Sequence, residues 1–248
     1  MSINPINIVS TAKNVVSRLP EAFAPNLESI PMQTLPLVDM TKEVIVIWVP
    51  GTNNHRVHPH FAAQAKLRWG NRASVVLSDY EAKWTFTTSI PDGYRMLKHI
   101  VDYVLKHRRP GQRIVLAGES QGALIIGELM ARKEYYKAID KAVLLGHPGI
   151  SERHYDSDKK VLEINNPSDP ATFKWPGEAV EIFKNLDKFF RKDLTTVPFF
   201  LKTAVNAPIQ AARLLFTSFG SIPFLSDILP HPHTYSGRME EAVLWLNA

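Results

Sequence analysis

Hydrophobic residues in the middle of the chain are grouped in short unbroken runs, many of them β-branched. A continuous apolar run of about four to eight residues is typical of a strand that is buried on both faces, as the strands of parallel sheets are. Runs of this kind predict strands at residues 43–49, 73–77, 113–117, 142–145 and 161–164.

The segments between these runs carry apolar residues at helical spacing. They predict helices at residues 59–69, 92–107 and 121–132. Gly70-Asn71 and Pro110-Gly111 follow the first two, where helix-breaking residues are expected. Strands that alternate with helices predict a doubly wound parallel sheet, whose ligand site lies at the carboxyl ends of the strands.

Two further regions depart from this pattern. Residues 6–19 predict a short amphipathic helix, and the proline-rich stretch after it predicts an extended arm. We therefore divide the chain into an N-terminal helix and arm, residues 1–42, and an α/β domain, residues 43–248. Nine of the twelve phenylalanines fall in a late segment and predict a helical insertion at about 171–230. We expect this insertion to have its own core, and it is also a candidate wall for an apolar acyl pocket.

Composition narrows the chemistry that is open to the chain. With 45% hydrophobic and 21% charged residues it has the profile of a globular protein. It contains no cysteine, which excludes disulfides, thiolate metal ligands, iron–sulfur clusters and a cysteine nucleophile. Catalysis would therefore use Ser, His, Asp, Glu or Lys side chains.

Targeting and charge signals are weak. The N-terminus lacks the basic and apolar regions of a signal peptide, and the longest apolar run, residues 44–49, is too short to cross a bilayer. We expect a protein made in the cytoplasm, without a transmembrane segment. Lys and Arg outnumber Asp and Glu by 29 to 24, a formal net charge of +5. The densest basic cluster, residues 106–109, ends a predicted helix, where cations are favoured, so we expect no nucleic-acid partner.

The strongest chemical signal is a Gly-x-Ser-x-Gly pentad centred on Ser120. It follows a predicted strand and opens a predicted helix, which is the context of a nucleophile elbow. Gly118 and Gly122 relieve crowding at such a sharp turn. The dipole of the helix favours negative charge that develops beside the serine. We predict Ser120 as the nucleophile.

A serine nucleophile needs a histidine base and a carboxylate that orients the histidine. In this architecture their order along the chain is Ser, acid, His. His147 follows the next strand too closely to leave room for an acid before it, and His154 precedes the last strand. The candidates for the base are therefore His231 and His233, in a loop before the predicted C-terminal helix.

We choose among the candidate acids by whether each aspartate precedes or follows the last predicted strand. Asp156 and Asp158 precede the strand residues 160–165. Asp169 follows them, at the carboxyl edge of the sheet where the nucleophile is expected. We predict Asp169 as the acid, with Asp79, after an earlier strand, as the second choice.

Two preorganised donors would stabilise the oxyanion. One is the backbone N–H of Gln121, directly after the nucleophile. The other belongs to the loop after the first strand, where Thr52 offers an N–H and a hydroxyl. His55, His58 and His60 lie in the same loop without an ordered metal-ligand spacing. We interpret them as a solvated rim and expect neither a metal nor a cofactor.

Four motifs together resemble those of the cutinase-like serine esterases, whose α/β-hydrolase fold is a three-layer sandwich with a central parallel sheet. The motifs are Pro-Gly-Thr at 50–52, Gly-x-Ser-Gln-Gly-Ala at 118–123, Asp-Pro at 169–170 and His-Thr-Tyr at 233–235. Over residues 43–248 the chain is most similar to the phage lysin B enzymes, which cleave the ester between mycolic acids and arabinogalactan. The resemblance implies a triad of Ser120, Asp169 and His233.

The same resemblance implies that Thr52 and Gln121 form the oxyanion hole. Cutinases are secreted and disulfide-bonded, whereas this chain has no cysteine. His233 follows Asp169 by 64 positions, as expected for the helical insertion of lysin B. The implied substrate is a lipid or glycolipid ester of an actinobacterial envelope, reached after release from the host cell. We interpret the net charge of +5 as attraction to that anionic envelope. A general lipase or esterase of the same mechanism, and a non-catalytic envelope-binding module, are the alternatives.

Overall fold

A computed structural model describes residues 38–83, 86–148, 159–166 and 235–248, and only the backbone of residues 86–88. The strands form one sheet in the order β2-β1-β3-β4-β5, in which every neighbouring pair is parallel. They are β1 (Val44–Val49), β2 (Ala73–Leu77), β3 (Arg113–Glu119), β4 (Lys141–Leu145) and β5 (Val161–Ile164). All of the predicted strands are confirmed to within two residues at each end.

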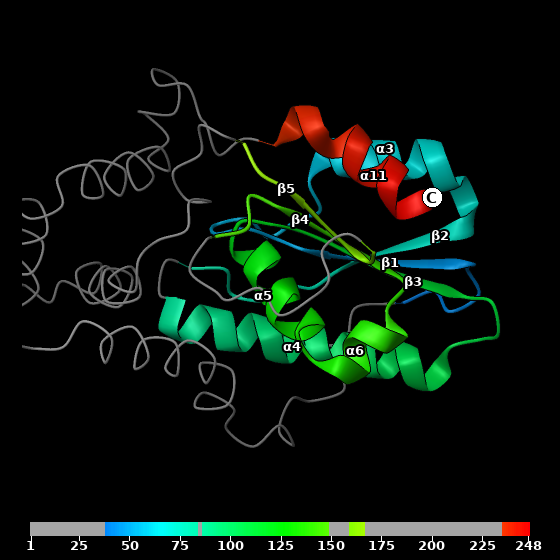
Figure 1. Cartoon of the computed structure of the whole chain (residues 1–248), viewed down its shortest axis with the longest axis horizontal. Coiled ribbons are helices and arrows are strands. Elements are labelled where there is room, and N and C mark those ends of the chain that lie inside the picture. Colours follow the sequence, from blue (N-terminus) through cyan, green and yellow to red (C-terminus); the bar gives the residue numbers. More distant parts are fainter. Residues whose placement is uncertain (1–37, 84–85, 149–158, 167–234) are drawn as a thin grey trace, which may run out of the picture.

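Helices cover both faces of this sheet, so the described residues build a three-layer sandwich (Figure 1). One face carries α3 (Pro59–Trp69) and α11 (Met239–Asn247), and the other carries α4 (Phe86–His107), α5 (Gln121–Met130) and α6 (Lys133–Ala138). Short 3-10 helices, η3 (Gly70–Arg72) and η6 (Ser236–Arg238), precede β2 and α11. The predicted sandwich is confirmed. The predicted insertion at 171–230 and residues 1–37 of the N-terminal region lie outside the described residues.

Side chains along β1 alternate between two cores, which explains its unbroken apolar run. All six residues of β1 are buried. Ile45, Ile47 and Val49 pack in the core that includes Leu97 of α4 and Ile125 of α5. Val44, Val46 and Trp48 pack in the core that includes Phe61 of α3 and Met239 of α11. A central strand covered on both faces needs an apolar residue at every position.

Two helices differ from their predicted bounds. α4 begins at Phe86, six residues before the predicted start, and contains Pro91. Proline lacks one backbone N–H, so it removes one hydrogen bond near the helix start, and the burial of Leu97 and Ile100 on the sheet offsets this loss. α5 ends at Met130, and the separate short helix α6 was not predicted, because six residues are too few for a periodic pattern.

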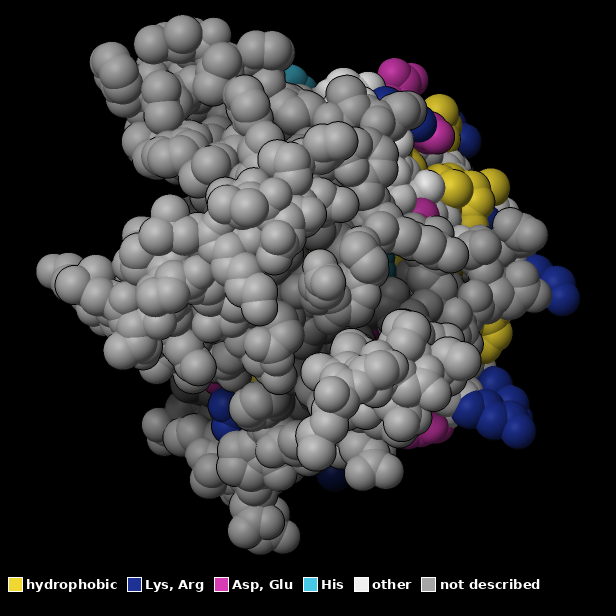
Figure 2. Space-filling view, turned by 60° about the vertical axis from the view of Figure 1, so that its left-hand side comes forward, with side chains coloured by type: hydrophobic (Ala, Val, Ile, Leu, Met, Phe, Trp, Pro, Cys, Tyr) yellow, Lys and Arg dark blue, Asp and Glu magenta, His cyan; other side chains and the backbone are white. Residues whose placement is uncertain are grey.

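Charged side chains on one face of the described residues are dispersed (Figure 2). In the face shown in Figure 2, Lys and Arg form separate groups near the rim, beside hydrophobic and acidic side chains. None of the helices in the described ranges combines the length and hydrophobicity that a bilayer crossing requires.

Candidate active site

Ser120 occupies the turn between β3 and α5, at the carboxyl edge of the sheet. Its backbone has φ 54° and ψ −116°, a conformation that costs a non-glycine residue about 1–3 kcal/mol. Among the described residues, Asn53 is the only other non-glycine residue with a positive φ. The Ser120 N–H donates to the carbonyl of Leu145, at the end of β4, over 2.8 Å. The neighbouring strand therefore helps to hold the strained residue in place.

The glycines of the pentad permit this turn to pack closely. A Cβ on Gly118 would lie 2.7 Å from Ile126 Cδ1 and 2.9 Å from the carbonyl carbon of Gly122. A Cβ on Gly122 would lie 2.1 Å from the carbonyl oxygen of Val49 in β1. A strained serine at a strand-to-helix turn on a parallel sheet covered on both faces has the geometry of a nucleophile elbow. The chain has an α/β-hydrolase fold.

Gln121, the first residue of α5, is held by its buried side chain. That side chain is 1% exposed. Its Oε1 lies 3.0 Å from Tyr80 Oη and 2.9 Å from Ser89 Oγ, and its Nε2 donates to the carbonyl of Lys83 over 3.2 Å. The N–H groups of a first helical turn have no acceptor within the helix. The Gln121 backbone N–H therefore has a suitable position along the chain to donate a hydrogen bond to an oxyanion.

The loop after β1 lies against the elbow. A Cβ on Gly51 would lie 3.3 Å from Ser120 Cβ and 3.1 Å from the carbonyl oxygen of Glu119. The loop turns at Thr52 and Asn53, and the N–H of Asn54 donates back to the Gly51 carbonyl over 3.1 Å. Thr52 therefore follows directly on a residue in contact with the nucleophile. Its role as oxyanion donor stays a prediction.

The histidines of this loop have different surroundings. His58 Nδ1 accepts from the N–H of His60 over 3.3 Å, and His58 Nε2 lies 3.3 Å from Ser236 Oγ. Burial lowers the pKa of His58, and the neighbouring His60 and Arg56 lower it further. His58 therefore joins the start of α3 to the segment before α11. Across the described residues, no three His, Cys, Asp or Glu side chains gather as a metal site would require.

Asp79, the second choice for the acid, follows β2. One carboxylate oxygen lies 4.0 Å from Nδ1 of His55, and both side chains are largely exposed. β1 separates β2 from β3, the strand that leads into Ser120. The structure therefore pairs Asp79 with a histidine of the loop rim.

Asp169 and His233, like the alternative base His231, lie outside the described residues. Their chain neighbours are described. The N–H of Asn166 donates to Tyr235 Oη over 3.1 Å, and Tyr235 is buried. This hydrogen bond joins the segment that leads to the predicted acid with the segment that follows the predicted base.

The joined segments lie at the same edge of the sheet as the nucleophile. Glu119 of β3 is level with Leu145 of β4, which is level with Ile164 of β5. The N–H of Gly146 donates to the Ile164 carbonyl over 2.9 Å. Because neighbouring strands are about 4.8 Å apart, the ends of β3 and β5 are roughly 10 Å apart.

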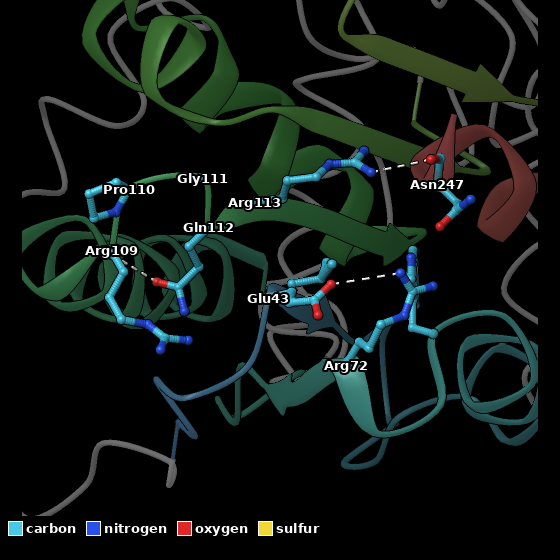
Figure 3. A pocket seen from close by; sticks show the side chains of 10 residues that line it. Glu43, Arg72, Arg109, Pro110, Gly111, Gln112, Arg113 and Asn247 are labelled. Atoms are coloured by element: carbon cyan, nitrogen blue, oxygen red, sulfur yellow. Dashed lines mark hydrogen bonds and ion pairs between the residues drawn. The ribbon is translucent and has the colours of Figure 1, made fainter.

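A pocket of about 520 Å³ lies at the opposite edge of the sheet (Figure 3). Its lining includes Arg113, the first residue of β3, and Arg72, which pairs with Glu43 at 3.7 Å. The Arg113 guanidinium donates to the carbonyls of Leu246 and Asn247 over 2.6 and 3.2 Å. Cations at these carbonyls stabilise the carboxyl end of α11. Seven residue steps along the chain, roughly 23 Å, separate Arg113 from Ser120, so this pocket is not the predicted acyl pocket.

Comparisons with known proteins give structural neighbours. No protein-family model matches the chain, and the search of curated proteins gave no match. A cutinase-like protein from Cryptococcus sp. is 18% identical with a TM-score of 0.37; the match covers 43% of this chain and about half, 54%, of that protein. A Trichoderma reesei cutinase in complex with a phosphonate inhibitor is 20% identical with a TM-score of 0.45, covering 75% of this chain and 91% of that one.

A third neighbour is the catalytic core domain of an acetyl xylan esterase from Trichoderma reesei. It is 11% identical with a TM-score of 0.41, and the match covers 63% of this chain and 98% of that domain.

The sequence pattern found Ser120, Gln121 and the loop at Thr52, all of which the structure places around one elbow. It missed Tyr80 and Ser89, because their contacts with Gln121 join residues 41 and 32 positions apart and leave no local pattern.

Proposed function

We propose that the chain is a serine esterase that needs no cofactor. The observation that carries this proposal is the strained backbone of Ser120 at the elbow, with Gly51 of the preceding loop packed against it. Ser120 Oγ attacks the acyl carbonyl and expels the alcohol, which leaves an acyl-enzyme. Water then releases the acid and regenerates the serine.

In this mechanism His233 takes the proton of Ser120 and passes it to the leaving alcohol, and Asp169 orients His233. The N–H groups of Thr52 and Gln121 stabilise the oxyanion. The hydrogen bond between Asn166 and Tyr235 supports this assignment. Asp169 is three positions after Asn166 in the chain, and His233 is two positions before Tyr235.

We expect a fluorophosphonate probe to label the wild-type protein at Ser120 and to leave Ser120→Ala unlabelled. The probe reacts only with a serine that a base and an oxyanion hole activate. Labelling is measured by intact-protein mass spectrometry, with circular dichroism to show that both proteins are folded. Absence of labelling in folded wild type would support the non-catalytic binding module instead.

For the substrate, the proposal is the mycolic acid ester of arabinogalactan in an actinobacterial envelope, cleaved during phage lysis. It is supported by the motif resemblance over residues 43–248, by the absence of cysteine and by the long segment between Asp169 and His233. A net charge of +5 also favours approach to an anionic envelope.

Incubation of the enzyme with purified mycolyl-arabinogalactan is expected to release free mycolic acid, measured by thin-layer chromatography and mass spectrometry. A parallel series of p-nitrophenyl esters of increasing chain length reports general esterase activity. Ser120→Ala is the control for both assays. Hydrolysis of the soluble esters without release of mycolate would favour the general lipase or esterase.

A further inference from the structure

The phenol of Tyr80 lies between the two segments that form the proposed oxyanion hole. Its Oη donates to the carbonyl of Pro50 over 2.8 Å and is also within hydrogen-bond distance, 3.0 Å, of Gln121 Oε1. Pro50 immediately precedes Gly51 and Thr52, and Gln121 follows the nucleophile. Tyr80 is 4% exposed, so water does not compete freely for these contacts. One buried hydroxyl therefore lies against both halves of the hole, with a single proton that the two acceptors share.

The segment Pro50-Gly51-Thr52 needs a contact from outside the loop to fix its backbone, because it contains Gly51. A side chain at this position would crowd Ser120 Cβ at 3.3 Å and the Glu119 carbonyl at 3.1 Å. Glycine is therefore favoured here, and it is the residue with the greatest backbone freedom. The bond from Tyr80 to the Pro50 carbonyl orients the peptide that enters Gly51, one peptide before the N–H of Thr52.

Tyr80 is itself held firmly. A Cβ on Gly93 of α4 would lie 2.8 Å from its ring, so the helix backbone packs directly on the phenol. Ser89, also in α4, donates to the Glu81 carbonyl over 2.7 Å and lies 2.9 Å from Gln121 Oε1. Burial raises the pKa of Tyr80 far above its ordinary range, and the Asp92 carboxylate adds to this effect. The hydroxyl therefore remains a proton donor at any pH at which an esterase operates.

We propose that Tyr80 is a positioning residue of the esterase site, which fixes the spacing between the Thr52 and Gln121 N–H groups. This inference rests on the proposed function. Because the oxyanion forms in the transition state and not in the bound ester, the loss of the Tyr80 hydroxyl lowers kcat and leaves KM nearly unchanged. Loss of a residue with only a structural role would lower stability without this selective fall in kcat at constant KM.

The test is Tyr80→Phe, which keeps the ring and removes the hydroxyl. We expect kcat for p-nitrophenyl butyrate to fall by about 10- to 100-fold with KM within about twofold, since removal of a direct oxyanion donor costs about 10²–10³-fold and a displaced donor costs less. The rate of labelling by the fluorophosphonate should fall in parallel. Assays are run well below the melting temperature of every variant.

Tyr135→Phe is the matched control. Tyr135 is also buried, and its hydroxyl donates to Asp102 over 2.7 Å, between α6 and α4. We expect the melting temperature of this variant to fall by about as much as that of Tyr80→Phe, and its kcat to stay at the wild-type value. The proposal is wrong if Tyr80→Phe keeps kcat within twofold, or if both variants lose kcat equally. A folded wild type that neither hydrolyses esters nor reacts with the probe overturns the esterase function itself, and the Tyr80 role with it.

Discussion

Replacement of His233 by alanine is expected to lower kcat for ester hydrolysis by about 10³-fold or more, because the serine loses its general base. His231→Ala is the matched variant, two residues away in the same loop, and we expect it to keep activity within a few-fold. The hydrogen bond from Asn166 to Tyr235 ties the segment after His233 to the carboxyl edge of β5. The measurement is steady-state kinetics with p-nitrophenyl butyrate.

Unfolding curves for both histidine variants provide the control, since a loss of fold would also remove activity. An inactive, folded His231→Ala beside an active His233→Ala would reverse the assignment of the base. Equal activity of both variants and wild type would exclude the triad that we propose.

Gly122→Ala is expected to lower the free energy of unfolding by about 4 kcal/mol or more, or to prevent folding. Its Cβ would lie 2.1 Å from the carbonyl oxygen of Val49 and 2.7 Å from that of Pro50. The first carbonyl belongs to Val49, the last residue of β1, and the second to the residue directly after it. Because β1 is hydrogen-bonded to β2 and β3 on its two sides, the sheet resists a shift of these carbonyls. Urea denaturation followed by circular dichroism gives the unfolding free energy.

Gly237→Ala is the control for this substitution. Among the described residues, none outside the immediate chain neighbourhood of Gly237 has an atom within 4 Å of a Cβ placed there. We therefore expect a change of about 0.5 kcal/mol or less. Equal urea midpoints for the two alanine variants would show that the elbow can widen, and that Gly122 is not required by its contact with β1.

The central strands β1, β3 and β4 were predictable because burial on both faces leaves a local trace, whereas the edge strands β2 and β5 are only partly buried. Each strand residue of β1 meets a core, so the apolar run is unbroken and its ends are clear. The start of α4 was not predictable, because Pro91 is a helix-start signal that packing on the sheet overrides. α6 is too short, and too polar in its sequence Lys-Glu-Tyr-Tyr-Lys-Ala, to show a helical period.

Part of the candidate site has the same local character. A strained serine needs glycines at fixed distances, so Ser120 can be found from its pentad together with the predicted strand and helix that flank it. The donor Gln121 follows from adjacency alone. The positions of Asp169 and His233 were inferred from chain order and from a resemblance, and they remain predictions.

The sequence by itself determined the parallel α/β architecture and the elbow at Ser120, because each depends on spacing within a few residues. Only the tertiary structure decided that Tyr80 meets both Pro50 and Gln121, which are 30 and 41 residues away. The reason is physical: these contacts depend on the strand order β2-β1-β3, which brings the ends of three strands together. No local pattern of hydrophobic and polar residues records which buried hydroxyl will lie between them.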